Sequence, residues 1–133
     1  MSLDIQESSR EGIAILTLKG RITMEESERL REAVNSLLAQ KQTKVILDLS
    51  HVDYVDSTGL GGMVICYTSI KRLDGALKLV NPNKRNIEML ALTKLYTVFE
   101  VFTDLLDAVN SFFPDRVIKR FDILAFVKSH SKD

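Results

Sequence analysis

The chain has 133 residues, 45% of them hydrophobic and 27% charged, which is typical of a single soluble globular domain. Its 18 Lys and Arg residues balance 18 Asp and Glu residues, so the formal net charge is zero. This balance argues against an electrostatic nucleic-acid binder, and it leaves little charge to oppose self-association, so a homodimer is compatible with the sequence.

The sequence carries no sign of export, membrane insertion or disulfide bonding. Its first residues lack the basic start and apolar core of a signal peptide. The longest run of apolar residues and glycines, Leu60–Tyr67, is far too short to span a membrane. One cysteine, Cys66, excludes an internal disulfide framework and any multi-cysteine zinc site. We therefore expect a cytoplasmic protein that binds neither a membrane nor a nucleic acid.

Hydrophobic periodicity predicts two strands and a helix at the start of the chain. The strands cover Leu3–Ser8 and Ile13–Lys19, and both faces of the second are largely apolar. Thr23 and Glu26 have the spacing of a capping box, in which the hydroxyl and the carboxylate each accept a hydrogen bond from a backbone N–H at the helix start. The predicted helix has one apolar stripe, formed by Leu30, Ala33, Val34, Leu37 and Leu38.

The rest of the chain alternates between strand and helix patterns. Strands are predicted over Val45–Leu49, Leu77–Val80 and Val98–Phe102, the last at a sheet edge. Helices are predicted over Leu60–Leu73, around Ile87–Ala91 and after Thr103, which could cap the last of them. From Ile13 onward the order is β-α-β-α-β-α-β-α, preceded by one hairpin strand. It predicts an α/β fold with a mixed, mostly parallel sheet and four main helices.

A C-terminal extension, residues 114–133, follows the predicted domain of residues 1–113. Within the extension, Asp122 could cap a short helix that bears the large apolar residues Ile123, Leu124, Phe126 and Val127. Large apolar side chains this close together are rarely left in water. We expect them to dock on the chain's own sheet or helices, or else to form a dimer or partner contact.

The segment Asp56-Ser57-Thr58-Gly59-Leu60-Gly61 carries the strongest functional signal. It connects a predicted strand to a predicted helix, whose unpaired N–H groups and dipole favour an anion. Loops that leave the carboxyl ends of parallel strands gather at one edge of the sheet. Three loops should therefore meet there, at residues 21–23, 51–57 and 81–85. This arrangement would place Ser57 beside Thr23 and the turn Asn81-Pro82-Asn83.

Several chemistries at this segment lack the residues that they require. No lysine follows the glycines as in a P-loop, a dinucleotide fingerprint lacks its third glycine, and a nucleophile elbow is only half met. His51 is a lone loop histidine, and Asp48, Asp53 and Asp56 fit scattered polar and capping roles better than a magnesium cluster. Two compatible interpretations are left. Either Ser57 or Asp56 simply caps the helix, or Ser57 is also phosphorylated, which would add about −1.5 to −2 charges.

The sequence resembles the STAS family, specifically the stand-alone bacterial anti-sigma factor antagonists, over roughly residues 3–113. The resemblance rests on Val45–Leu49, Val52–Gly61, Asp74–Leu79, Asn81-Pro82 and Leu92–Leu95. In that family the serine directly after the aspartate is the phosphoacceptor, and Ser57 matches it. Around it the resemblance implies a partner-binding surface, with Asp56 orienting the loop and the glycines allowing close approach of backbone and partner. Its residues would be Thr23, Asp56, Thr58, Gly59, Gly61 and Asn81.

The resemblance also implies a partner-switching mechanism. The unphosphorylated antagonist would bind an anti-sigma factor of the histidine-kinase-like ATPase fold and so release a sigma factor. The same anti-sigma factor, acting as a serine kinase, would phosphorylate the antagonist and end the interaction, and a PP2C-type phosphatase would restore it. ATP and metal would belong to the partners, so we expect no cofactor, no metal site and no enzymatic activity in this chain.

Two departures from the family pattern are visible. Many relatives carry an aspartate where this chain has Thr23, and the C-terminal extension has no counterpart in the minimal family pattern. A different function would be a non-switching adaptor or scaffold subunit of a signalling or lipid-transport complex, with the apolar extension as its contact. Weak binding of a purine nucleotide at the Ser57 edge is a third alternative.

Overall fold

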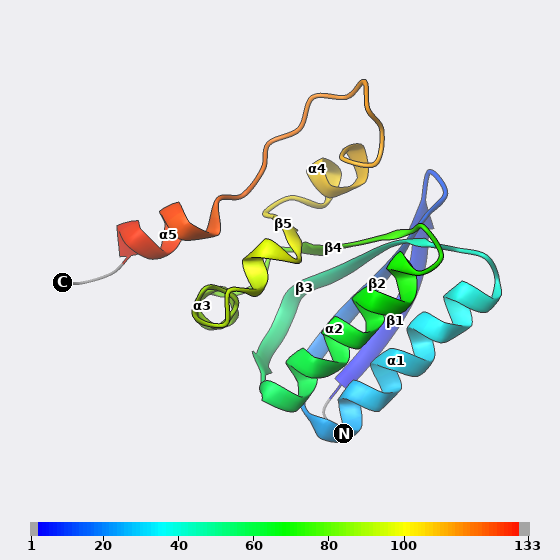
Figure 1. Cartoon of the computed structure of the whole chain (residues 1–133), viewed down its shortest axis with the longest axis horizontal. Helices are drawn as coiled ribbons and strands as arrows, with labels where there is room; N and C mark the ends of the chain where they lie inside the picture. The colour runs from blue at the N-terminus through cyan, green and yellow to red at the C-terminus, as the bar shows by residue number, and fades with distance from the viewer. Residues whose placement is uncertain (1–2, 131–133) are drawn as a thin grey trace.

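The computed structural model describes residues 3–130 and contains one five-stranded sheet in the order β1-β2-β3-β4-β5 (Figure 1). The hairpin strands β1 and β2 pair antiparallel, and the pairs β2–β3, β3–β4 and β4–β5 are parallel. This arrangement confirms the predicted α/β fold with a mixed, mostly parallel sheet. The strands are β1 Leu3–Arg10, β2 Ile13–Ile22, β3 Lys44–Val55, β4 Ala76–Val80 and β5 Glu100–Phe102.

The helices cover both faces of the sheet. Helices α1, α2 and α3 contribute to the larger hydrophobic core on one face, while α4 covers a smaller core on the other. Within residues 3–130, no helix combines the length and apolarity needed to cross a membrane. The helices are α1 Met24–Ala39, α2 Ser57–Lys71, α3 Lys84–Leu92, the 3-10 helix η1 Leu95–Thr97, α4 Leu105–Asn110 and α5 Ile123–His130.

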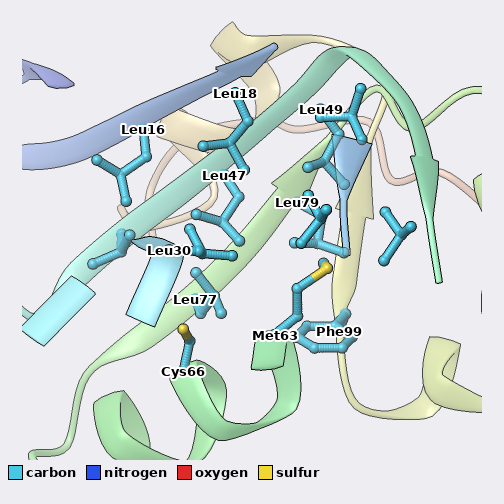
Figure 2. Close-up of a cluster of buried hydrophobic side chains, with 14 of the residues drawn as sticks. Leu16, Leu18, Leu30, Leu47, Leu49, Met63, Cys66, Leu77, Leu79 and Phe99 are labelled. Atoms are coloured by element: carbon cyan, nitrogen blue, oxygen red, sulfur yellow. The ribbon is translucent and has the colours of Figure 1, made fainter. Parts of the chain in front are cut away.

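The two apolar faces of β2 explain why helices pack on both sides. Successive side chains of a strand point to opposite faces of the sheet. Leu16 and Leu18 therefore point into the larger core, where Figure 2 shows them near Leu47 of β3 and Leu30 of α1. Ile13 and Ile15 point into the smaller core, together with Ala108 and Val109 of α4. The parallel strands are thus buried on both faces, as their sequence pattern predicted.

Strand β3 is longer than the sequence predicted. It continues to Val55 rather than ending at Leu49, so His51 lies in the strand, opposite Lys19, and not in a loop. The sequence did not predict this stretch as a strand because many of its residues are polar. In the structure the pairing with β2 shifts in register and then continues to Val55. The connection from β3 to α2 is therefore a single residue, Asp56.

Two helices begin at residues other than those predicted, and a third differs from its prediction in the contacts of its cap. Helix α2 begins at Ser57 rather than Leu60, because Asp56 caps it directly after β3. Helix α4 is capped by Asp104 rather than Thr103, since the Asp104 carboxylate accepts the Leu106 N–H at 3.3 Å. Thr23 precedes α1 as predicted, but the expected capping box is wrong in one half. The Thr23 hydroxyl donates to the Glu26 carboxylate and accepts no N–H from the helix.

Strand β5 is shorter than predicted, because Val98 and Phe99 do not join the ladder: both of their N–H groups donate to the Leu95 carbonyl of η1, at 3.0 Å. The prediction for the C-terminal extension is confirmed in its first form, since the apolar residues dock on the chain itself. Asp122 accepts the Ala125 N–H at 3.1 Å at the start of α5. Ile123 belongs to the larger core, Phe126 and Val127 pack against it, and Leu124 stays half exposed.

Candidate functional site

The carboxyl ends of β2 and β3 are joined through the backbone at the predicted edge. The Asp56 N–H donates a hydrogen bond of 3.2 Å to the carbonyl of Ile22, the last residue of β2. Gly59, in the first turn of α2, lies against the same carbonyl, and a Cβ at this position would clash with the Ile22 oxygen. Residues 21–23 and Asp56-Ser57 are therefore neighbours, as the sequence predicted.

Asp56, rather than Ser57, caps helix α2. Its backbone is extended, and its carboxylate oxygen Oδ1 accepts the Gly59 N–H at 2.7 Å. This bond satisfies one of the free N–H groups that every helix leaves in its first turn. Of the two capping alternatives that the sequence left open, the structure therefore selects Asp56. Ser57 is the first residue of the helix itself.

Ser57 and Thr58 are both exposed to solvent at this helix start. The Ser57 hydroxyl is thus accessible to an enzyme that would modify it, while the cap is formed by its neighbour. A negative charge added here would lie near the unpaired N–H groups and the positive end of the α2 dipole. The Asp56 cap does not use the Ser57 hydroxyl.

The glycines of the segment have different surroundings. Gly59 is buried against Ile22 and brings two backbones of the same chain together. Gly61 is exposed, and a Cβ there would meet no atom within 4 Å. Gly62, which the sequence analysis did not single out, lies so close to Ser27 of α1 that a Cβ would clash with the Ser27 hydroxyl. Helices α1 and α2 are therefore packed tightly beside the candidate site.

The loop after β4 is attached to the same edge by asparagine side chains. The Asn83 amide donates to the carbonyls of Val52 and Asp53 at 3.2 and 3.1 Å, and the buried Asn86 amide donates to Val52 at 3.2 Å. Asn81 has a left-handed backbone (φ 54°), and its amide donates to the Ser50 hydroxyl at 3.3 Å. Asn81 is exposed, but its partner Ser50 lies five residues before the end of β3, about 16 Å along an extended strand. Contrary to the sequence prediction, the structure therefore does not place Asn81 beside Ser57, because β3 extends beyond the end of β4.

Two of these contacts were missed by the sequence analysis. Asn86 stands among apolar residues in the pattern of α3, and a lone asparagine on a buried helix face was the signal that could have revealed it. The guanidinium of Arg85 lies 4.7 Å from the ring centre of Tyr54 and adds a cation–π contact between α3 and β3. Both contacts hold the end of β3, from which Asp56 and Ser57 follow.

Metal and thiol chemistry find no support at this edge. Within residues 3–130, no three His, Cys, Asp or Glu side chains are grouped so that they could hold a metal ion. Asp48 instead accepts the N–H and the hydroxyl of Ser50, at 3.0 and 2.6 Å. Cys66 is buried in the larger core, and burial raises the pKa of its thiol to about 11. The thiol is therefore neutral at physiological pH.

The fold and the site together define a small α/β domain that presents a serine at a helix start, directly after a capping aspartate. A family model described as "STAS domain" matches residues 4–108, and the chain belongs to this family.

Proteins of known name and structure share this similarity. The chain is 27% identical over 113 residues to the anti-sigma-F factor antagonist RsfB of Mycobacterium tuberculosis, covering 82% of this chain and 91% of that protein. It is 29% identical over 101 residues to the anti-sigma-B factor antagonist of Bacillus subtilis, covering 76% and 92%. The crystal structure of an anti-sigma factor antagonist from Mycobacterium paratuberculosis superposes with a TM-score of 0.75 at 22% identity, covering 83% and 93%. This last likeness supports the fold.

Proposed function

We propose that this protein is an anti-sigma factor antagonist that binds an anti-sigma factor and is switched off when that partner phosphorylates Ser57. The observation that carries the proposal is the position of Ser57, exposed at the first residue of α2 and directly after the Asp56 cap. Two relatives that bear the name of anti-sigma factor antagonists match this chain over about nine-tenths of their own lengths, 91% and 92%. In this proposal the chain is the substrate of a kinase rather than an enzyme.

The switch would act through charge on an otherwise unchanged surface. In the unphosphorylated state the partner would bind an exposed surface formed by Ser57, Thr58 and Gly61, with Thr23 beside it and Asn81 farther back along β3. Asp56 and Gly59 would not contact the partner themselves but would fix the backbone under this surface. Asp56 does so by accepting the Gly59 N–H, and Gly59 by packing against the Ile22 carbonyl. A phosphate on Ser57 would place about two negative charges beside the Asp56 carboxylate. Repulsion and desolvation of these charges would then end the interaction.

In this proposal the partners supply the ATP and the metal that the switch requires. The anti-sigma factor, of the histidine-kinase-like ATPase fold, would bring ATP, and a PP2C-type phosphatase with its metal would remove the phosphate. The alternative of an adaptor depended on the apolar extension as a free contact surface. Its buried side chain Ile123 is packed in the chain's own core, which favours the switch over the adaptor.

The direct test is phosphorylation of the purified full-length protein by its cognate anti-sigma factor with ATP, followed by peptide mass mapping. We expect one phosphate, on Ser57. Thr58→Ala provides the matched control, because it removes the neighbouring exposed hydroxyl and leaves the Asp56 cap intact. Phosphate carried by Thr58 alone, or no phosphate after prolonged incubation, would contradict the assignment of Ser57.

A further inference from the structure

The C-terminal extension, described here over residues 114–130, passes around the edge of the sheet. It leaves α4 on one face, runs past β5 and ends in α5 beside α3 on the other face (Figure 1). Two contacts hold it to β5: Arg120 is paired with Glu100, and the Phe121 N–H donates to the Val101 carbonyl at 3.4 Å. An open pocket of about 360 Å³ lies along this seam, between residues 96–101 and residues 120–124.

The extension is attached to the larger core through α5. Ile123 is only 5% exposed and belongs to the larger core, whereas its neighbour Leu124 is 51% exposed. The rings of Phe121 and Phe126 pack against each other with their centres 5.5 Å apart, and both contact the core. Helix α5 thereby packs against α3. Docking of α5 depends on a few apolar side chains rather than on the seam along β5.

Helix α3 also contacts β3, beside the candidate site, through residues at its own N-terminal end. Its cap residue Asn83 and its buried residue Asn86 donate to the Val52 carbonyl, and Asn83 also donates to the Asp53 carbonyl. These carbonyls come three and four residues before Asp56. With nine residues, α3 is too short to be stable on its own, so its position depends on what packs against it. The extension and the candidate site therefore share one short helix.

We propose that the C-terminal extension is a positioning element for the Ser57 segment: α5, docked through Ile123, holds α3 in place, and α3 holds the Val52–Asp53 backbone that leads into Asp56 and Ser57. When α5 detaches, α3 loses packing on its apolar side and frays, and its asparagine bonds to β3 weaken. The Ser57 segment is then less ordered. The coupling stands on the structure alone, and its effect on phosphorylation rests on the proposed function.

Hydrogen exchange of the full chain tests the coupling directly. In Ile123→Asp, which places a charge in the core contact of α5, we expect backbone exchange to become about tenfold faster over residues 84–92 and 52–59. Exchange over residues 14–18 of the central strand β2 is expected to stay unchanged and reports that the domain is folded. Leu124→Asp adds the same charge on the exposed side of the same helix, and we expect exchange at the wild-type rate.

Three results would overturn the proposal. Exchange over 52–59 could stay at the wild-type rate while α5 loses protection, which would uncouple the two regions. Leu124→Asp could act like Ile123→Asp, which would show that docking through Ile123 is not the cause. If Ile123→Asp also speeds exchange in β2, Ile123→Ala is measured instead, and fast exchange in α5 without a change over 52–59 would again contradict the coupling. If the exchange rates show the coupling but no variant is phosphorylated, the proposed function is wrong and the coupling still holds.

Discussion

Gly59 lies against the backbone carbonyl of Ile22 so closely that a Cβ at position 59 would clash with the carbonyl oxygen. The same carbonyl accepts the Asp56 N–H at 3.2 Å. The start of α2 and the end of β2 are thus joined where no side chain fits. This junction fixes the backbone on both sides of Ser57.

Replacing Gly59 should be costly for this reason. We expect Gly59→Ala to lower the free energy of unfolding by about 1–3 kcal/mol, because the backbone must shift to admit a methyl group. Gly61→Ala is the matched control in the same helix, with open space around the added Cβ. It is expected to raise the free energy of unfolding by about 0.5–1 kcal/mol, since alanine restricts the unfolded chain. Urea unfolding measures both, and equal values would contradict the close contact.

The assignment of the helix cap to Asp56 makes a second prediction. Asp56→Ala removes the acceptor of the Gly59 N–H and should lower the free energy of unfolding by about 0.5–2 kcal/mol. Ser57→Ala leaves the cap in place and exchanges an exposed side chain, so its effect should stay within about 0.5 kcal/mol. Thermal or urea unfolding distinguishes the two. A larger loss in Ser57→Ala than in Asp56→Ala would mean that the serine is the cap.

The order of strands and helices could be predicted because apolar periodicity is a local property of the sequence. The end of β3 could not, since Ser50, His51 and Asp53 carry no apolar alternation. The strand conformation of this stretch comes from pairing with β2, in which His51, Val52, Tyr54 and Val55 have partners some thirty residues earlier in the chain. The start of α4 failed for a different reason. Thr103 and Asp104 are both good cap residues, and only the three-dimensional course of the turn after β5 selects between them.

The candidate site could be located from sequence, but its supporting contacts could not. A serine between an aspartate and glycines, after a strand, is a local pattern, and parallel topology predicts which loops surround it. The contacts of Asn86 with Val52 and of Gly62 with Ser27 join elements that are distant in the chain. Such contacts depend on how helices are placed on the sheet, which no local pattern specifies.

The ion pair between the buried Lys78 and Glu100 makes the stability of the fold depend on pH. Lys78 is 8% exposed, and its Nζ lies 3.0 Å from Glu100 and 2.8 Å from the Ser111 hydroxyl. Burial alone would raise the pKa of Glu100, but hydrogen bonds and charge from Lys78 and Arg120 outweigh burial and lower the pKa. A carboxylate whose pKa is lower in the folded state stabilises the fold above its unfolded pKa. This stabilisation is lost as the pH falls through the folded pKa.

Glu100→Gln should therefore lower the free energy of unfolding at pH 7, because Lys78 is left without its counterion. Between about pH 5 and pH 3 the variant should lose less stability than the wild type, since the titrating group is gone. Urea unfolding across this pH range measures both effects. Glu11→Gln breaks an exposed pair with Arg116 and is the control, expected to change stability little at pH 7. Parallel pH profiles of wild type and Glu100→Gln would contradict the role of Glu100.

The buried thiol of Cys66 should be unreactive in the folded protein. With burial raising the pKa to about 11, the thiolate is roughly a thousandth of the population at pH 8. Labelling with a chromogenic disulfide reagent should be slow in the native state and fast in urea, where the side chain is exposed. Labelling at the same rate in both conditions would show that Cys66 is accessible.

The proposed switch can be tested by adding charge at two positions of the same helix. Ser57→Asp places a carboxylate at the site of the phosphate and should weaken binding to the cognate anti-sigma factor by at least about tenfold, through repulsion and desolvation at the contact. Ser57→Ala keeps the surface uncharged and should bind like the wild type.

Thr68→Asp supplies the control for charge alone. Thr68 is exposed on α2, and the eleven residues that separate it from Ser57 correspond to about 16 Å along the helix. This variant should also bind like the wild type when affinities are compared by calorimetry. If Ser57→Asp and Ser57→Ala bound equally well, charge at Ser57 would not be the switch. If Thr68→Asp weakened binding as much as Ser57→Asp, net charge rather than position would explain the loss.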